Sequence, residues 1–354
     1  MRLQIELATP GHGLACPAMP EISVIMGVCN GGRFLAATVA SVRAQTFTDW
    51  ELILVDNGST DGAVAALLAA HPDPRIRVSW HPAPLSPGGA LEVACREARG
   101  RYLAVLDSDD LAVPRRLEIQ RAYLDLQPGV WLLAGASDLI DEDGNPLGRE
   151  PFVGRHEDIF ALTAHVHVLR HSTVMFRREL LERIQYRALM GIGSDHDFFA
   201  RAAELGRVEA LPVVLCQYRL HRENLTKQKG RSAISRGLVA MLAHRRRRGW
   251  PEDAVLWEQK FSALLGEAHG HAGPVYLGCA RLFAAEGMDD LAALFAWEAM
   301  RHDARWSGLL CYLRVTLRGL GRSRPVAVAT ARAWLKEPAH QLLRASGAPD
   351  RPQF

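Results

Sequence analysis

The stretch of residues 102–110, YLAVLDSDD, places the strongest constraint on how this chain can fold. It begins as an apolar run of strand length and ends in three carboxylates, Asp107, Asp109 and Asp110, with no turn residue before them. A buried strand that ends this way presents its acids at the edge of a sheet, where open α/β folds bind ligands. Close like charges repel one another by on the order of 1 kcal/mol per pair. We therefore expect a divalent metal there, bridged to a substrate that carries oxygens. The alternative is that these aspartates only cap the following turn and helix.

Short β-rich apolar runs alternate with helical segments on both sides of this stretch. The pattern predicts strands at residues 22–28, 50–55, 75–80, 102–106, 130–136, 171–176 and 211–220. It predicts helices at residues 33–44, 63–70, 89–99, 114–126 and 196–205, and a hairpin-like turn at 141–146. Such alternation is typical of an α/β fold, with a mostly parallel, Rossmann-like sheet flanked by helices. The carboxyl ends of the strands would then bring Cys29-Asn30 and Asp56-Asn57 to the same edge as the acidic run.

The 354-residue chain divides by pattern into three parts. Residues 1–20, rich in Pro and Gly, read as a loose leader, and residues 21–225 form the α/β domain. In residues 226–354 the strand pattern stops and a helical appendage is expected. Its arginines, interleaved with Trp and Leu, are compatible with contact to an anionic membrane surface, or with an ordinary solvated helical face.

Composition excludes several classes of protein. The net charge of +3 is the small difference between 42 basic and 39 acidic residues, and no nucleic-acid-binding motif occurs, so nucleic acid is not an expected partner. Six dispersed cysteines without a CxxC pair or zinc-type spacing indicate reduced thiols in a cytoplasmic protein. No run approaches the roughly 18 apolar residues of a membrane span, so we expect a cytoplasmic protein, with peripheral contact to the inner face of the membrane left open.

Neither of two common phosphate-binding motifs is present. The turn after the first strand, GVCNGG, does not match GxGxxG, and GxxxxGK[ST] is absent.

Three segments together resemble the family 2 inverting nucleotide-sugar glycosyltransferases of the GT-A type. They are ISVIMGVCNGGRFLAATVASVRAQTFTDWELILVDNGSTDG, ARGRYLAVLDSDDLAVPRRLE and SDHDFFARAAELG. Their order and spacing match over roughly residues 20–222, which leaves the C-terminal region outside the resemblance. The resemblance implies a GT-A fold and a nucleoside diphosphate sugar, UDP-linked, as donor.

The resemblance also implies roles for residues of the donor site. Val28, Cys29 and Asn30 would line the nucleotide pocket, and Asp56 would contact the uracil or another base. Asp107 would face the ribose or the donor sugar.

The metal and the catalytic base are assigned in the same way. Asp109 would coordinate Mn²⁺ or Mg²⁺ beside the diphosphate, and Asp195 would be the base, with an N-cap role as the alternative or an additional role. His221 would reach the metal or diphosphate, and Arg219 the donor, although both are also compatible with structural positions. His171 begins a segment that resembles the acceptor side of the family, or an ordinary strand.

Two positions depart from the family pattern. Ser194 stands where the family usually has Glu, and Glu92 where many relatives have Asn. Either Glu92 points away from the nucleotide or the donor pocket differs.

The expected function is inverting transfer of a sugar to a hydroxyl of a glycan or glycolipid, in surface polysaccharide or lipid-linked oligosaccharide synthesis. The base takes the proton of the acceptor hydroxyl as its oxygen attacks the anomeric carbon. The two departures leave open a catalytically degenerate domain that binds nucleotide-sugars or serves in assembly. A sugar nucleotidyltransferase is disfavoured, because it requires a Gly-rich, Arg-containing loop of a kind that residues 28–33 lack.

Overall fold

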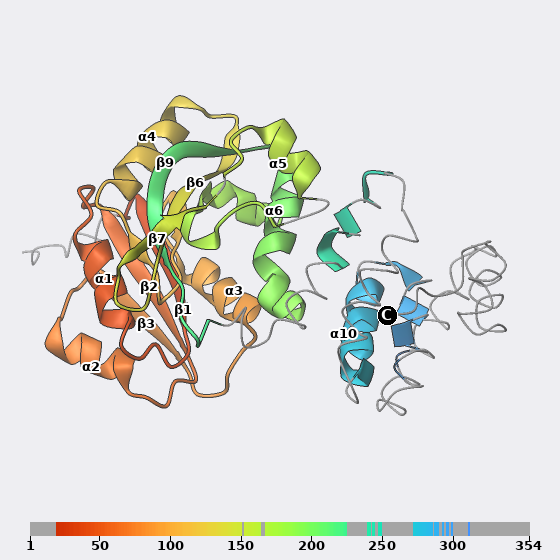
Figure 1. The fold of residues 1–354 in the computed structure, drawn as a ribbon, viewed down its shortest axis with the longest axis horizontal. Helices are drawn as coiled ribbons and strands as arrows, with labels where there is room; N and C mark the ends of the chain where they lie inside the picture. Colours follow the sequence, from red (N-terminus) through yellow and green to blue (C-terminus); the bar gives the residue numbers. More distant parts are fainter. Residues whose placement is uncertain are drawn as a thin grey trace, which may run out of the picture.

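The protein contains a twisted sheet covered by helices on both faces (Figure 1). The structure is a computed structural model that describes residues 19–150, 152–163 and 167–224. Of the remainder it describes residues 239–241, 243–244, 247–249, 272–285, 287–289, 292–293, 295–296, 299 and 311.

The described residues form one mixed sheet of nine strands. Its spatial order is β3 (Ile76–His81), β2 (Trp50–Asn57), β1 (Ile22–Val28), β4 (Tyr102–Val105), β8 (Met175–Arg177), β6 (Val130–Ile140), β9 (Arg207–Arg219) and β5 (Leu111–Ala112), with β7 (Pro146–Arg149) paired to β6. The half from β3 to β4 is parallel throughout. Strands β8, β5 and β7 pair antiparallel with their neighbours, whereas β6 and β9 are parallel. The predicted α/β class is confirmed, with a sheet that is mixed rather than parallel beyond β4.

The central strands are apolar on both faces because both faces are covered. Side chains alternate along a strand, so Val24 and Met26 of β1 enter one core while Ile25 enters the other. Leu54 and Val55 of β2 divide between the two cores in the same way. This double burial explains why the strands read as continuous apolar runs in the sequence.

Six helices of the described α/β part supply the two layers. They are α1 (Leu35–Arg43), α2 (Ala63–Ala70) and α4 (Arg116–Leu126) on one face, and α3 (Pro87–Glu97), α5 (His156–Leu162) and α6 (Ser194–Leu205) on the other. Helix α3 begins where Ser86 Oγ accepts a hydrogen bond from Gly89 N at 3.2 Å and Pro87 occupies the first helical position.

One predicted strand is wrong in its first half. Residues 171–173 form a 3-10 helix, η1 (His171–Thr173), and only Met175–Arg177 form β8. In this 3-10 turn, Ser172 donates its hydroxyl to Asp110 at the end of the acidic run. Two further 3-10 helices, η2 (Arg178–Glu182) and η3 (Ala188–Gly193), lead into α6.

The C-terminal region contributes helix α10 (Ala272–Ala285), which agrees with the helical pattern there. Most of the predicted appendage, including most of its basic and aromatic residues, lies outside the described residues. Within the part of the chain that the structure describes, no helix is both long and apolar enough to cross a membrane.

Candidate active site

Hydrogen bonds connect the loops that follow β1 and β2. Val28 is paired in register with Asp56, so the two strands end at the same edge. Asn30 adopts a left-handed backbone with φ 54°. Its side-chain Oδ1 accepts a hydrogen bond from Thr60 N at 2.8 Å, while its own N–H donates to Ser59 Oγ at 3.0 Å. The loop after β1, which carries Cys29 and Asn30, is therefore fixed by the loop after β2, which begins beyond Asp56 and Asn57.

The end of β2 is fixed in turn by the loop after β3. Asp56 is buried, and its Oδ1 accepts a hydrogen bond from Ser59 N at 2.9 Å. Asn57 exchanges two hydrogen bonds with the backbone of Leu85, at 2.6 and 3.0 Å. Val28 is buried, whereas Cys29 is exposed. Of the residues predicted to line the nucleotide pocket, Cys29 and Asn30 thus present surface at this edge.

Of the three acids in the run, Asp110 has a structural role. It is completely buried, accepts a hydrogen bond from Arg219 N at 2.9 Å and another from the Ser172 hydroxyl. Ser172 Oγ also accepts from Asp107 N at 3.1 Å. Burial raises the pKa of Asp110 well above its ordinary value, and the charges of Asp109 and Asp107 raise it further. Asp110 therefore joins the run to β9 and η1 instead of facing a ligand.

Asp109 and His221, the two predicted metal ligands, lie together. Asp109 Oδ2 is 2.8 Å from His221 Nε2 and accepts a hydrogen bond from Asn224 Nδ2 at 3.3 Å. Burial raises the pKa of Asp109, as does the charge of Asp107. His221 packs on the ring of Phe34 with centroids 4.7 Å apart, and its buried Nδ1 has no hydrogen-bond partner among the described residues.

This pair fits a divalent cation. A carboxylate and an imidazole are both ligands for divalent metals such as Mn²⁺, and a bound ion would replace the hydrogen bond between Asp109 Oδ2 and His221 Nε2. The described residues contain no group of three or more His, Cys, Asp or Glu side chains suited to a metal. A cation at this position would take its remaining ligands from substrate phosphates and water, as Mg²⁺ usually does.

Arg219 holds Asp109 in place. It is buried, and it donates from Nε to the Asp109 carbonyl at 3.0 Å and from Nη1 to the carbonyls of Asp141 and Glu142 at 3.2 and 3.0 Å. Its guanidinium also lies over the Phe34 ring at 4.8 Å. These contacts give Arg219 a bracing position, and its predicted contact with the donor stays a prediction.

Asp107 is the most open acid of the run, with 42% of its side chain exposed. Its Oδ1 lies 3.1 Å from Nδ1 of the buried His171, whose Nε2 lies 3.1 Å from the Tyr186 hydroxyl. Burial raises the pKa of Asp107, but the charge and hydrogen bond of His171 outweigh it and lower the pKa overall. Asp107 is thus an oriented carboxylate that faces solvent.

Asp195 lies in the first turn of α6, where its Oδ1 accepts a hydrogen bond from His196 N at 2.7 Å. Its Oδ2 lies 3.0 Å from His167 Nε2. Although burial raises the pKa of Asp195, the charge and hydrogen bond of His167 and the charge of His171 hold it well below its ordinary value. The side chain is 22% exposed, so the group remains a carboxylate that a ligand can reach, as a general base must.

The site is continuous from Asp107 to Asp195. The charge of Asp195 raises the pKa of His171, whose ring contacts Asp107, so Asp195 lies within electrostatic reach of Asp107. The fold therefore gathers the end of β4, the end of β9 and the start of α6 around one edge of the sheet.

The two departures from the family pattern have structural settings. Ser194 is buried against Gly88 of α3, where an added Cβ would lie 2.8 Å from Ser194 Cβ, so a small side chain suits this contact. Glu92 pairs with Arg96 one turn along α3, at 2.9 Å. Glu92 also lines a second pocket, together with residues 181–187 and Arg201.

Several residues of the site carry no clear signal in the sequence. His167 and Ser172 come from segments without regular structure or with a single 3-10 turn, and Tyr186 from a connecting loop. Asn224, three residues after His221, is the exception, because it shares the short polar run that follows β9.

Comparison with known proteins identifies the family. The family model described as glycosyl transferase family 2 matches residues 23–185. The putative glycosyltransferase EpsE of Bacillus subtilis is 38% identical over 127 residues, which are 35% of this chain and 46% of that protein. The UDP-Glc:alpha-D-GlcNAc-diphosphoundecaprenol beta-1,3-glucosyltransferase WfgD of Escherichia coli is 30% identical over 122 residues, 34% of this chain and 47% of that protein. The chain thus spans about half the length of these two relatives.

A solved structure supports the fold. The mannosyltransferase PcManGT of Pyrobaculum calidifontis, in complex with GDP-Man and Mn²⁺, superposes with a TM-score of 0.50 at 21% identity, over 91% of this chain and 89% of that one. The matched family model assigns residues 23–185, which carry Asp56, Asp107 and Asp109, to glycosyl transferase family 2.

Proposed function

We propose that this chain is a metal-dependent, inverting glycosyltransferase that moves a sugar from a nucleoside diphosphate donor, UDP-linked, to a hydroxyl of a glycan or glycolipid. The observation that carries the proposal is the grouping of a solvent-facing acid, Asp107, a metal-type pair, Asp109 and His221, and an accessible carboxylate, Asp195. Each group has a separate part in the reaction.

Asp195 acts as the base. In its carboxylate form it accepts the proton of the acceptor hydroxyl while that oxygen attacks the anomeric carbon from the face opposite the departing diphosphate. His167 and the backbone N–H of His196 orient the two carboxylate oxygens. The proton ends on Asp195 and is then lost to solvent.

The donor half binds and orients the nucleotide-sugar. Cys29, Asn30 and Asp56 lie at the nucleotide end, and Asp107 faces the ribose or the sugar. Asp109 and His221 would hold Mn²⁺ or Mg²⁺, which as a Lewis acid stabilises negative charge on the leaving diphosphate. Arg219 and Asp110 keep this acidic segment in place from behind.

Surface polysaccharide or lipid-linked oligosaccharide assembly is the proposed setting. The name of the relative WfgD gives a UDP-sugar as its donor and a diphosphoundecaprenol-linked sugar as its acceptor. The same classes of donor and acceptor are proposed for this chain. The division into residues 1–20, 21–225 and 226–354 is part of this proposal, with catalysis in the second part and peripheral membrane contact in the third.

A nucleotide-sugar panel tests the metal and the reaction together. The purified protein is assayed for nucleoside diphosphate release with Mn²⁺, with Mg²⁺ and with a chelator. Release is expected only with metal, and Asp109→Asn should lower it by about 10³-fold, because a bound metal supplies several kcal/mol of charge stabilisation. Asp143→Asn, in the exposed hairpin, is the matched control.

Full activity in chelator would overturn the metal assignment. Binding of UDP with Mn²⁺ but no turnover with any donor or acceptor would favour the alternative of a degenerate domain that binds nucleotide-sugars without transfer.

A further inference from the structure

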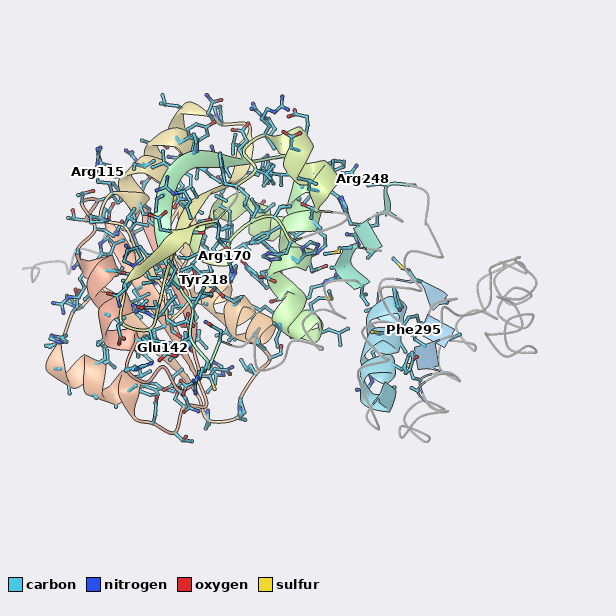
Figure 2. The ribbon with its side chains drawn as sticks, in the orientation of Figure 1. Arg115, Glu142, Arg170, Tyr218, Arg248 and Phe295 are labelled. Atoms are coloured by element: carbon cyan, nitrogen blue, oxygen red, sulfur yellow. The ribbon has the colours of Figure 1, made fainter. Side chains whose placement is uncertain are left out.

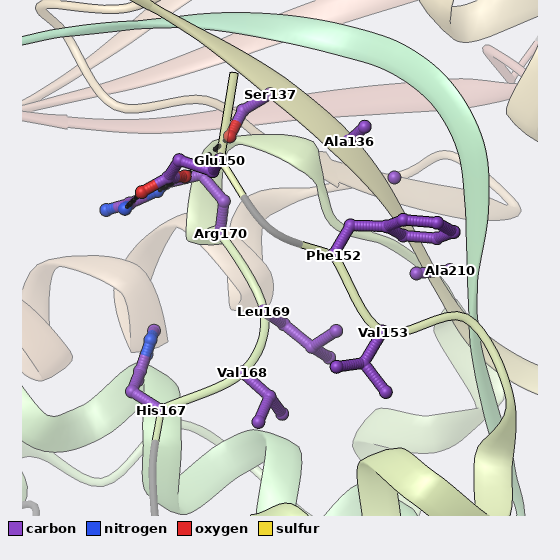
Figure 3. Close-up of a pocket in the computed structure, with 11 residues that line it drawn as sticks. Ala136, Ser137, Glu150, Phe152, Val153, His167, Val168, Leu169, Arg170 and Ala210 are labelled. Carbon is purple, nitrogen blue, oxygen red and sulfur yellow. Dashed lines mark hydrogen bonds and ion pairs between the residues drawn. The ribbon is translucent and has the colours of Figure 1, made fainter. Parts of the chain in front are cut away.

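A pocket of about 260 Å³ lies on the side of the site that carries His167 (Figure 3). Its walls come from β6, from Ala210 of β9, from the segment around Phe152 and from the segment 167–170. The volume is just below the roughly 300 Å³ at which ligand pockets usually begin, so the occupant is about the size of a monosaccharide. None of the roles proposed for Asp107, Asp109 and Asp195 involves this pocket.

The lining has an apolar part and a polar part. Phe152, Val153, Val168 and Leu169 form the apolar part in Figure 3. Phe152 is 39% exposed, which leaves part of its ring open to a ligand. Flat apolar rings of this kind stack on the C–H face of a pyranose.

At the polar end, Ser137, Glu150 and Arg170 form a fixed hydrogen-bonding group. Glu150 Oε2 accepts from Ser137 Oγ at 2.6 Å and from Arg170 Nε at 2.8 Å, and Arg170 Nη2 bonds the other carboxylate oxygen. Although burial opposes both charges, this pairing lowers the pKa of Glu150 and raises that of Arg170. The guanidinium also lies 3.8 Å from the Tyr218 ring (labelled with Arg170 in Figure 2).

This arrangement indicates a neutral ligand. The carboxylate of Glu150 already balances the charge of Arg170, and His167 at the other end of the pocket pairs with Asp195. A phosphate would have to break one of these pairs. Hydroxyl groups, which both donate and accept, can add to the remaining lone pairs of Glu150 and Ser137 without breaking either pair.

The pocket and the base share a wall. His167 lines the pocket, and its Nε2 lies 3.0 Å from Asp195 Oδ2. At the other end, Arg170 is close enough to Asp110 for that charge to raise the pKa of the guanidinium. A sugar in the pocket would therefore lie one side chain away from the base.

We propose that this pocket binds an uncharged glycosyl residue of the acceptor, with a pyranose face on Phe152 and hydroxyls on Ser137 and the Glu150–Arg170 pair. The inference rests on the proposed function for its link to transfer. It names the part of the acceptor that the enzyme recognises, which is a neutral sugar and not the phosphate of a lipid carrier.

Binding is tested without turnover by saturation-transfer NMR. The full chain is mixed with UDP, Mn²⁺ and each of several methyl glycosides, including those of β-glucose and of N-acetyl-β-glucosamine. At least one glycoside should receive saturation on its ring protons. Phe152→Ala, at a partly exposed position, should reduce the signal at least fivefold, and so should Glu150→Gln. Leu147→Ala, on exposed β7, should leave it unchanged.

Kinetics then separate this inference from the proposed function. With a donor that is turned over, Phe152→Ala should raise KM for the glycoside at least tenfold and leave donor hydrolysis and donor KM unchanged. If transfer depends on Asp195 but KM for the glycoside is unchanged in Phe152→Ala and Glu150→Gln, the pocket assignment is overturned and the proposed function stands. Absence of glycoside binding, or displacement of the glycoside by farnesyl phosphate from a Phe152-dependent site, also overturns it. Phe152-dependent glycoside binding without turnover of any donor supports the pocket and counts against the proposed function.

Discussion

The proposed donor side and the proposed acceptor side of this site are built from different structural elements. On the donor side, Asp56 lies at the end of a parallel strand, and Cys29, Asn30 and Asp107 follow parallel strands whose register sets where each loop begins. On the acceptor side, Asp195 comes from the first turn of α6, whereas His167, Phe152 and Arg170 come from segments outside regular structure that lie beside β6 and β9. Strand register fixes the first side through many backbone hydrogen bonds, whereas single side-chain contacts fix the second. We expect substitutions between the two sides to affect transfer more than donor binding.

Among the substitutions that lie between the two sides, Gly88→Ala should have the largest effect on transfer. An added Cβ would lie 2.7 Å from the Arg187 carbonyl oxygen and 2.8 Å from Ser194 Cβ, so α3 and the start of α6 must separate. Such overpacking costs about 1–3 kcal/mol of stability, and a shift of about 1 Å in a catalytic group lowers the rate about 10²-fold. Thermal unfolding and transfer assays measure both effects.

Gly129→Ala serves as the control for Gly88→Ala, since an added Cβ there meets no atom within 4 Å. UDP affinity of Gly88→Ala should stay within about threefold of wild type, a change of roughly 0.7 kcal/mol. An equal loss of UDP binding and transfer would mean that the two sides are not separable.

His167→Ala should alter the pH dependence of transfer. Asp195 is active as a carboxylate, and its lowered pKa keeps it in that form as the pH falls. Without His167, burial raises the pKa, so activity should be lost at higher pH on the acid side, with the midpoint moved up by about 1–3 units. Rate–pH profiles of transfer by wild type and His167→Ala measure the two acid midpoints.

His167→Gln can still donate a hydrogen bond but carries no charge, so its acid midpoint should fall between those of wild type and His167→Ala. An acid midpoint that is the same in all three proteins would remove His167 as a positioning residue for Asp195.

Glu92→Gln should have the smallest effect. Glu92 forms only an exposed pair with Arg96, and such pairs contribute about 0–1 kcal/mol. Donor affinity and transfer should stay within about twofold of wild type, a change of roughly 0.4 kcal/mol. A large gain in donor affinity would place this carboxylate at the nucleotide after all, and isothermal titration with UDP measures it.

The sequence predicted strands β1, β2 and β4 and their common edge because strands leave a periodic signal. The apolar run before Asp107 and the polar residues after Val28 and Val55 follow from burial on both faces of the sheet, so their common edge could be inferred. That Asp109 and His221 lie near the same metal was predicted only through the resemblance to the glycosyltransferase family. More than a hundred residues separate them, and no local sequence pattern joins them.

The acceptor side could not be predicted in the same way. The segment at 171–176 has the composition of a strand, but the buried hydroxyl of Ser172 is better satisfied by Asp110 and Asp107, so the chain turns as η1. His167 and Phe152 contribute through contacts across the fold, and nothing in their neighbouring residues indicates those contacts.

Asp195 is proposed as the base, and the donor site is proposed to bind its ligand without it. Single-turnover transfer by Asp195→Asn, with saturating nucleotide-sugar and Mn²⁺, tests both points. Asparagine keeps the shape of the side chain but cannot accept the proton. Transfer should fall by about 10²–10⁴-fold while the variant still binds the donor with wild-type affinity. Transfer at the wild-type rate by a variant that binds donor normally would contradict the assignment of Asp195 as the base.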